Sequence, residues 1–212
     1  TGDNIHFVFT SAGQVWYAHS TDGGTSWIPE ISLGYGEKPA IALDADNNPN
    51  VSWVRFEWGP EGGGWERATL WYDGSQWIPA LVLETLLGGP EHVVYGFSQP
   101  AMVIDDADTV RLVWEWAELW APPGGVGYWK YSWCVEYGQF RKDVASFTEM
   151  AALDTFSIVS PPPWEEPKSP SITWHYDGDY HTHCVWSKVT DKEIYYSERT
   201  TTGWSSPPTN LS

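Results

Sequence analysis

Short apolar runs separated by turn residues make up most of this chain. Examples are IHFVF at 5–9, VWYA at 15–18 and RLVW at 111–114. Short runs rich in β-branched and aromatic residues, bounded by Gly, Asp, Asn and Pro, are typical of β-strands. One segment, 143–153, is a mild helical candidate, and we expect its first half to be a strand instead. The pattern therefore predicts an all-β protein.

The apolar runs recur in a fixed order. KPAIALDADNN at 38–48 returns as QPAMVIDDADT at 99–109 and as SPSITWHYDGD at 169–179. A second run that ends in an aromatic residue follows, and then a third run. The turn after the third run ends in a further aromatic residue, the exit aromatic, which opens the fourth strand. The second-run aromatics are Phe9, Trp53, Trp114 and Trp186, and the exit aromatics are Trp27, Trp77, Phe140 and Trp204. Units of four short strands predict β-propeller blades, and a β-sandwich is the alternative.

We expect one propeller domain or segment over 1–212, with four blade-like units at roughly 1–36, 37–87, 98–150 and 168–212. The first unit begins at its second strand, so its first strand is missing by register. An uncovered strand edge is a template for further pairing. We therefore expect a segment of a larger propeller, closed by continuation of the chain or by self-association.

The turn STDGGTSW at 20–27 resembles the Asp-box, or BNR repeat, of sialidase-like β-propellers. Ser20, Asp22, Gly24 and Trp27 match that pattern, and Ser26 stands where the family has Thr. Degenerate copies are YDGSQW at 72–77, EYGQF at 136–140 and SERTTTGW at 197–204. The resemblance implies a structural turn between the third and fourth strands of a blade, away from the active site.

Connections of antiparallel strands alternate between two ends of a blade, and the segments expected at the end opposite the box are long. They are 56–67, 84–98, 115–125 and 152–169. Long connections on a rigid scaffold often carry function. Indole faces stack on sugars, and carboxylates accept hydrogen bonds from hydroxyl groups. A cationic ligand, or simple lids over the blade ends, would use the same residues. The candidate ligand-binding residues are Trp58, Trp65, Glu66, Glu115, Trp116, Trp120, Trp164 and Glu165.

Two patterns resemble metal sites. Asp44, Asp46 and Asn48 begin like a Ca²⁺ loop, but the Gly and Glu that such a loop needs at its sixth and twelfth positions are absent. We expect a turn there, with Ca²⁺ as the lesser alternative. His181 and His183 alternate on a predicted strand near His175, and Zn²⁺ is conceivable. No third ligand has convincing spacing, so packing is preferred and no metal is predicted.

The two cysteines, Cys134 and Cys184, are too few for a disulfide scaffold. We expect them on the third strand of one unit and the second strand of the next. We predict that they form no bridge.

The net charge of −17, from 28 acidic and 11 basic residues, argues against nucleic acid and anionic membranes as partners. No apolar run is long enough to span a membrane. No residue matches the catalytic positions of sialidases. We therefore expect a secreted or cell-surface module that binds a glycan or a protein surface without catalysis. A sialidase-like glycoside hydrolase fragment and a structural domain of an extracellular assembly are the alternatives.

Overall fold

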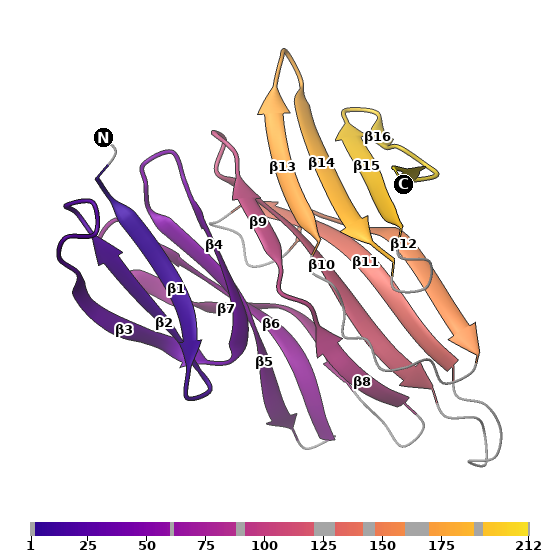
Figure 1. Ribbon diagram of the computed structural model, residues 1–212, viewed down its shortest axis with the longest axis horizontal. Helices are drawn as coiled ribbons and strands as arrows, with labels where there is room; N and C mark the ends of the chain where they lie inside the picture. Colours follow the sequence, from indigo (N-terminus) through magenta and orange to yellow (C-terminus); the bar gives the residue numbers. More distant parts are fainter. Residues whose placement is uncertain are drawn as a thin grey trace.

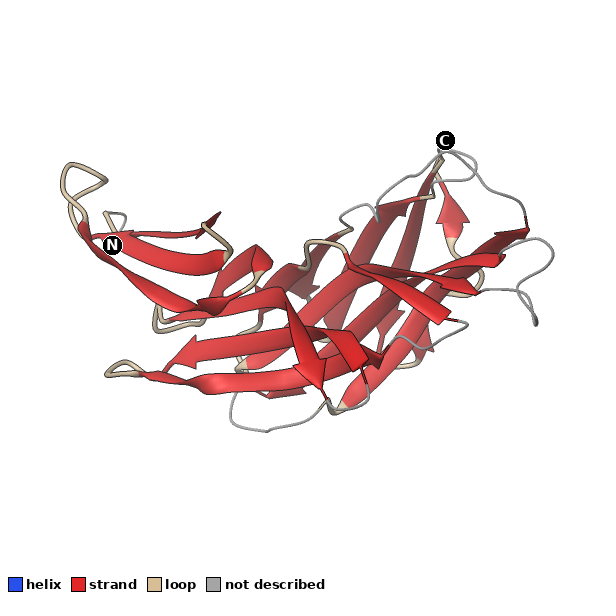
Figure 2. Cartoon of the chain, turned by 90° about the horizontal axis from the view of Figure 1, so that it is seen from below, coloured by secondary structure: helices blue, strands red, loops and turns tan. Residues whose placement is uncertain are grey.

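The computed structural model describes residues 3–59, 62–87, 92–120, 130–141, 147–159, 170–188 and 193–211. Within these ranges every regular element is a β-strand, and no helix is present (Figure 2). The strands form four antiparallel sheets that follow one another in chain order (Figure 1). The prediction of an all-β, propeller-like fold is confirmed.

The first two sheets are simple meanders, because each strand pairs with the one before it. The first has the order β1-β2-β3 and the second the order β4-β5-β6-β7. Their bounds are β1 Ile5–Ser11, β2 Gln14–Ser20, β3 Ile28–Tyr35, β4 Glu37–Leu43, β5 Pro49–Gly59, β6 Gly62–Tyr72 and β7 Trp77–Leu87.

The third and fourth sheets each carry an additional short strand. In the third, β10 pairs with β11 on one side and with both β8 and β9 on the other; in the fourth, β15 pairs with both β16 and β17. Their bounds are β8 His92–Phe97, β9 Ala101–Ile104, β10 Thr109–Trp120, β11 Lys130–Arg141, β12 Glu149–Val159, β13 Ser171–Tyr176, β14 Tyr180–Ser187, β15 Ile194–Thr200, β16 Gly203–Trp204 and β17 Thr209–Asn210.

The core lies between consecutive sheets. The first strands of successive sheets are neighbours, since β4 contacts β9 and β9 contacts β13. Three apolar clusters fill the spaces between the first and second, second and third, and third and fourth sheets. This packing of successive sheets face to face, with their first strands adjacent, is the arrangement expected of propeller blades.

The aromatic residues of the second strands anchor this core. The residues two positions before them, Val51, Leu112 and Cys184, each pair with an equivalent residue of the first strand of the sheet. Trp53, Trp114 and Trp186 therefore hold the same position relative to the first strand. They are only 1 %, 0 % and 3 % exposed. Phe9 lies on β1 and is half-buried. The sequence repeat thus marks equivalent places in three sheets.

Several predicted loops are strands. Residues 56–59 and 62–67 belong to β5 and β6, in which Phe56 pairs with Trp65. Segment 115–120 continues β10, and 84–87 and 92–97 belong to β7 and β8. The loop prediction was wrong there because the antiparallel backbone pairing of the adjoining strands continues through these residues.

The fourth strand of the third sheet is also displaced from its predicted place. It begins at Glu149, later than the first half of 143–153. Phe140 lies within β11, so it is not an exit aromatic, and EYGQF is strand rather than turn. Phe147 packs on the rings of Trp114 and Phe140 instead, and a Cβ on Gly138 would collide with it.

The cysteine prediction is confirmed. Cys134 on β11 and Cys184 on β14 are both buried, and neither forms a disulfide bond. Cys184 belongs to the cluster between the third and fourth sheets.

Candidate functional site

The turn at 20–27 is held together by its own side chains. The Asp22 carboxylate accepts hydrogen bonds from the Ser26 backbone N–H, at 2.9 and 3.1 Å, and from the Ser26 hydroxyl at 2.6 Å. Ser20 Oγ donates to Asp22 at 2.8 Å and accepts from the N–H of Gly24 at 2.8 Å. The Ser26 hydrogen bonds lower the pKa of Asp22 to about 2. Trp27, by contrast, is 47 % exposed.

Other hairpin turns use the same device. Asp44 Oδ1 accepts from the N–H groups of Asp46 and Asn48, at 3.0 and 2.8 Å. Asp73 Oδ1 accepts from the N–H groups of Ser75 and Gln76, each at 2.8 Å. A carboxylate that satisfies two backbone donors fixes the turn locally. These bonds explain the Asp-Asn patterns at 44–48 without a metal ion.

These turns border a cavity between the first and second sheets. Its volume is about 350 Å³, and its lining comes from β1, β2, the beginning of β3 and the β4–β5 and β6–β7 turns. The polar lining includes Asn47, Asn48, Ser75 and Gln76, which are the turn residues fixed by Asp44 and Asp73. The cavity therefore lies at the end of the sheets that carries the short turns.

Aromatic rings form much of the cavity wall. Trp77 lies edge-to-face with Tyr17, with ring centroids 5.0 Å apart and planes at 74°, and its ring is 5.6 Å from that of Tyr72. His6 Nδ1 and the Tyr17 hydroxyl are 2.7 Å apart, and His19 stacks on both His6 and Tyr17. Four strands of two sheets thus bring these rings together.

Histidine and tyrosine are the titratable residues among the described residues that line the cavity. Burial, and secondarily His19, lowers the pKa of His6, so that its imidazole stays uncharged. Burial, and secondarily Tyr72, raises the pKa of Tyr17 to about 12. Among the described residues that line the cavity there is no Asp, Glu, Lys or Arg. The arrangement suits an uncharged ligand that combines apolar faces with hydroxyl or amide groups.

The cavity residues were not predicted as a site from the sequence. A signal was present, since Tyr17 and Tyr72 hold the same place in the repeated runs QVWYAHS and TLWYDGS. That similarity shows that the two strands are equivalent. It does not show that the rings of Tyr17 and Tyr72 line one cavity between two sheets.

The predicted site residues lie on strands or outside the described part. Trp58 is on β5, and Trp65 and Glu66 are on β6, with their side chains outside the described parts. Trp164 and Glu165 lie outside the described residues altogether.

The remaining three lie on β10, and the structure separates them. Glu115 is fully buried, and its backbone exchanges hydrogen bonds with Ser98. Trp116 packs against the cluster between the second and third sheets, with its indole N–H buried and unpaired. Trp120 is 43 % exposed. Of the described side chains in the predicted set, Trp120 is the one that presents a broad surface to solvent.

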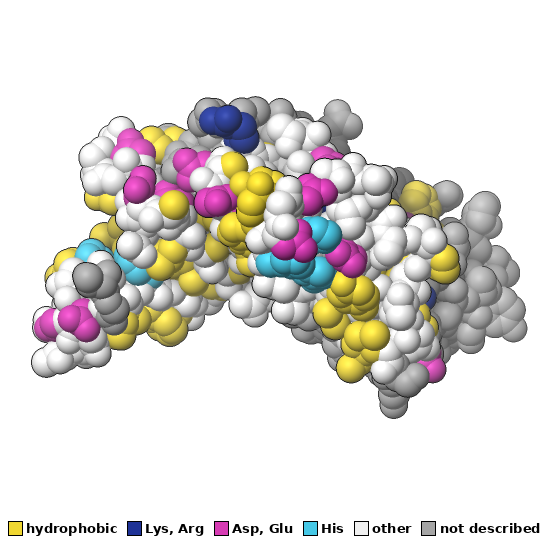
Figure 3. Space-filling model, turned by 90° about the horizontal axis from the view of Figure 1, so that it is seen from above, with side chains coloured by type: hydrophobic (Ala, Val, Ile, Leu, Met, Phe, Trp, Pro, Cys, Tyr) yellow, Lys and Arg dark blue, Asp and Glu magenta, His cyan; other side chains and the backbone are white. Residues whose placement is uncertain are grey.

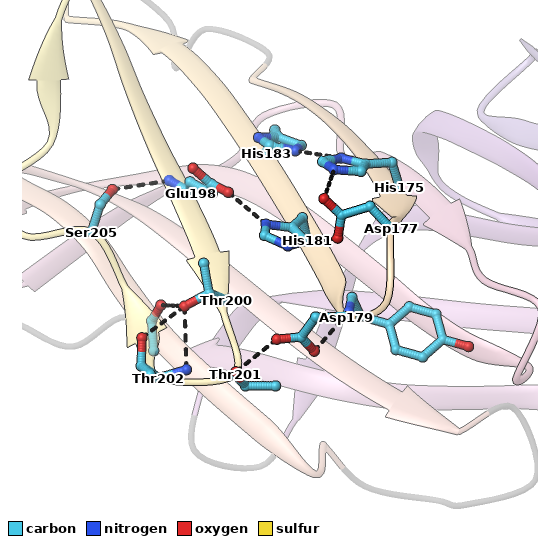
Figure 4. A network of polar contacts seen from close by, with 12 residues as sticks. His175, Asp177, Asp179, His181, His183, Glu198, Thr200, Thr201, Thr202 and Ser205 are labelled. Carbon is cyan, nitrogen blue, oxygen red and sulfur yellow. Dashed lines mark hydrogen bonds and ion pairs between the residues drawn. The ribbon is translucent and has the colours of Figure 1, made fainter.

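Histidines gather on the β13–β14 hairpin. His175, Asp177 and His181 offer nitrogen or carboxylate oxygen atoms that all lie within 4.8 Å of one another. His183 Nε2 is 2.9 Å from His175 Nδ1, and Glu198 Oε1 is 2.7 Å from His181 Nδ1 (Figure 4). The Glu198 hydrogen bond raises the pKa of His181.

Comparison with known proteins gives two similarities to carbohydrate-cleaving enzymes. A probable oligoxyloglucan-reducing end-specific xyloglucanase of Neosartorya fischeri is 30 % identical over 87 residues, which cover 36 % of this chain and 10 % of that protein. The match thus spans about a tenth of the length of that relative. A GH43 endo-arabinanase from Bacillus licheniformis superposes over 100 % of this chain and 74 % of its own, with 16 % identity and a TM-score of 0.48.

No protein-family model matches the chain. Neither similar protein is named as a sialidase, so the sialidase-like assignment stays a prediction. Among the described residues, no helix has the length and apolar character that crossing a bilayer would require.

Proposed function

We propose that this chain is a propeller segment that binds a neutral saccharide in the cavity between its first two sheets. The observation that carries the proposal is the cavity wall, in which the rings of Tyr17, Tyr72 and Trp77 stand beside the amides of Asn47 and Asn48. The function preferred from the sequence is the binding of a glycan or a protein surface, with the binding residues placed at the opposite end of the sheets.

The chemistry of the wall matches that of a sugar ring. A pyranose has apolar C–H faces that stack on aromatic rings and a rim of hydroxyl groups that both donate and accept hydrogen bonds. Asn47, Asn48, Ser75 and Gln76 supply donors and acceptors, and the Asp-anchored turns hold their backbone in place. Groups fixed before binding cost less conformational entropy when the ligand arrives.

The lack of carboxyl groups among the described lining residues favours binding over cleavage at this place. Glycoside hydrolysis generally requires two carboxyl groups on either side of the scissile bond. The described residues that line the cavity include neither Asp nor Glu. The xyloglucanase similarity supports a connection with glycans. The second candidate is a glycoside hydrolase fragment, with its carboxylates at the end of the sheets opposite the short turns, where the sequence analysis placed the Trp and Glu residues. We propose a secreted or cell-surface location for either function.

The test is calorimetric titration with neutral oligosaccharides, beginning with xyloglucan and arabinan fragments. The variants are Gln76→Ala and Trp77→Ala, and the matched control is Trp204→Ala. Trp204 lies edge-to-face with Tyr137, at 4.7 Å and 69°, much as Trp77 does with Tyr17. Each Trp variant therefore loses a similar intramolecular contact, but only Trp77 lines the cavity.

We expect Trp77→Ala to weaken binding at least about tenfold, equivalent to about 1.4 kcal/mol, while Trp204→Ala binds like the wild type. Gln76→Ala, which removes an exposed side chain, should weaken binding with little effect on the melting temperature. Equal losses in the two Trp variants would contradict the assignment of the cavity. Turnover of the oligosaccharides by the wild type would favour the hydrolase.

A further inference from the structure

A second cluster of polar groups lies far along the chain from the cavity, on the β13–β14 hairpin. His175 and His181 are directly paired across the hairpin, and their rings stack 4.8 Å apart at 13°. The His183 ring stacks on His175 at 5.0 Å. On the molecular surface the histidines stand together, bordered by acidic side chains (Figure 3).

The hydrogen-bond partner of His181 determines its tautomer. Glu198 Oε1 lies 2.7 Å from His181 Nδ1. A carboxylate only accepts, so the proton of this bond must be on Nδ1. Neutral His181 then has a bare lone pair on Nε2, and this atom lies 3.2 Å from Asp177 Oδ1. A lone pair and a carboxylate oxygen at that distance repel each other.

The same carboxylate orients His175 through a relay. The Tyr196 hydroxyl donates to Glu198 Oε2 at 3.4 Å, so its oxygen accepts the Nδ1–H of His183 at 2.7 Å. His183 Nε2 therefore accepts from His175 Nδ1–H at 2.9 Å. His175 Nε2 is left with a bare lone pair, 3.8 Å from Asp177 Oδ2.

When both imidazoles are neutral, three acceptors therefore lie close together without a donor between them: two imidazole Nε2 atoms and one carboxylate (Figure 4). Because the two rings are nearly parallel, at 13°, they must turn about their Cβ–Cγ bonds for both lone pairs to point at one ion. Imidazole nitrogen and carboxylate oxygen are ligands that Zn²⁺ prefers, at about 2.0–2.1 Å, which places neighbouring ligand atoms of a tetrahedron roughly 3.3 Å apart. The Nε2–Oδ separations are 3.2 Å for His181 and 3.8 Å for His175, and the ligand atoms of the three residues all lie within 4.8 Å, so small side-chain movements bring them to that value. Metal-bound histidines commonly donate their other ring N–H to a carboxylate, which orients the ring. Glu198 holds that position next to His181 Nδ1.

We propose that His175, Asp177 and His181 bind one divalent transition-metal ion such as Zn²⁺. Glu198 and the Tyr196–His183 relay orient the two imidazoles. The side chains of His175 and Asp177 are 49 % and 62 % exposed, so an ion can enter from solvent and keep water at its fourth position. The sequence did not show Asp177 as the third ligand because the hairpin pairing brings it to the histidines. The site is independent of the saccharide cavity.

The test is titration of the chelator-treated full chain with ZnCl₂ by calorimetry, and with CoCl₂ by visible absorption, which reports the coordination geometry. The variants are Asp177→Asn and His181→Gln. The matched control is His19→Gln, because His19 also stacks on a cross-strand histidine, His6, but belongs to the first sheet. Asp177 is in an exposed turn, so its substitution tests the ligand without disturbing the core.

We expect one Zn²⁺ per chain, a tetrahedral Co²⁺ spectrum, and affinity at least about tenfold lower in both ligand variants. Zn²⁺ should also raise the melting temperature of the wild type and of His19→Gln. The proposal is overturned if the wild type does not bind Zn²⁺, or if Asp177→Asn binds as tightly as the wild type. The first of these results would indicate that a proton between Asp177 and His181 fills the site.

Discussion

The junction between the first two sheets makes a sharp test of the packing described here. Gly36 links β3 to β4, has φ of +142° and donates its N–H to the Gly13 carbonyl at 3.0 Å. A Cβ placed on it would collide with the indole of Trp53 and lie 2.5 Å from the Val54 carbonyl oxygen. Trp53 is 1 % exposed and donates its Nε1–H to the Tyr35 carbonyl, so the ring has no room to retreat.

Two terms add in Gly36→Ala. A backbone conformation that L-residues rarely adopt costs about 1–3 kcal/mol. Forcing extra volume into a packed core costs about 1–3 kcal/mol. Gly34→Ala is the matched control, because Gly34 has a similar φ of +135° but its Cβ would meet only Trp53 Cζ2, at 3.7 Å. We therefore expect losses of about 2–6 kcal/mol for Gly36→Ala and about 1–3 kcal/mol for Gly34→Ala.

Urea unfolding followed by tryptophan fluorescence measures both free energies. A difference of about 2 kcal/mol corresponds to about 4–8 °C in melting temperature for a chain of this size. Equal destabilisation by the two substitutions would show that Trp53 does not press on Gly36, and the packing of the first sheet on the second would have to be revised.

Two further predictions concern the predicted turn and the thiols. Because the pKa of Asp22 is lowered to about 2 by its hydrogen bonds to Ser26, the ionised carboxylate stabilises the fold above pH about 4 and this contribution is lost as the pH falls through about 2. Thermal melts should show Asp22→Asn less stable than the wild type at pH 6, with the gap closing toward pH 2; a gap that does not change with pH would refute this. Burial raises the pKa of the Cys184 thiol, and Cys134 is 3 % exposed, so a thiol reagent should label neither in the folded protein and both in urea without reductant. Rapid labelling of the native chain, or none after unfolding, would disprove it.

The sheets were predictable from the sequence because their signals are local. Alternating apolar runs and Asp-centred turns such as the one at Asp22 need only neighbouring residues, and the hydrogen bonds of that turn lie within 20–26. The long hairpins were mistaken for loops because their Gly, Pro and Glu residues are typical of solvent-exposed connections. The alternation in WEWAELW at 114–120 was the signal for a strand, and the full burial of Glu115 shows how closely this segment packs.

The sites depend on contacts that spacing alone does not reveal. His6, Tyr17 and Trp77 come from three strands in two sheets, and only the packing of the sheets makes them neighbours. The histidine cluster is more local, yet the position of Asp177 follows from the pairing of His175 with His181. Predicting either one would have required the strand register and the order of the sheets.

The most direct test of the saccharide proposal is a crystal structure of the chain with a bound neutral oligosaccharide. The account predicts a sugar ring against Tyr72 and Trp77, with its hydroxyl groups bonded to Asn47, Asn48 or Gln76. A sugar found instead at the far end of β10, beside Trp120, with the cavity between the first two sheets empty, would contradict it.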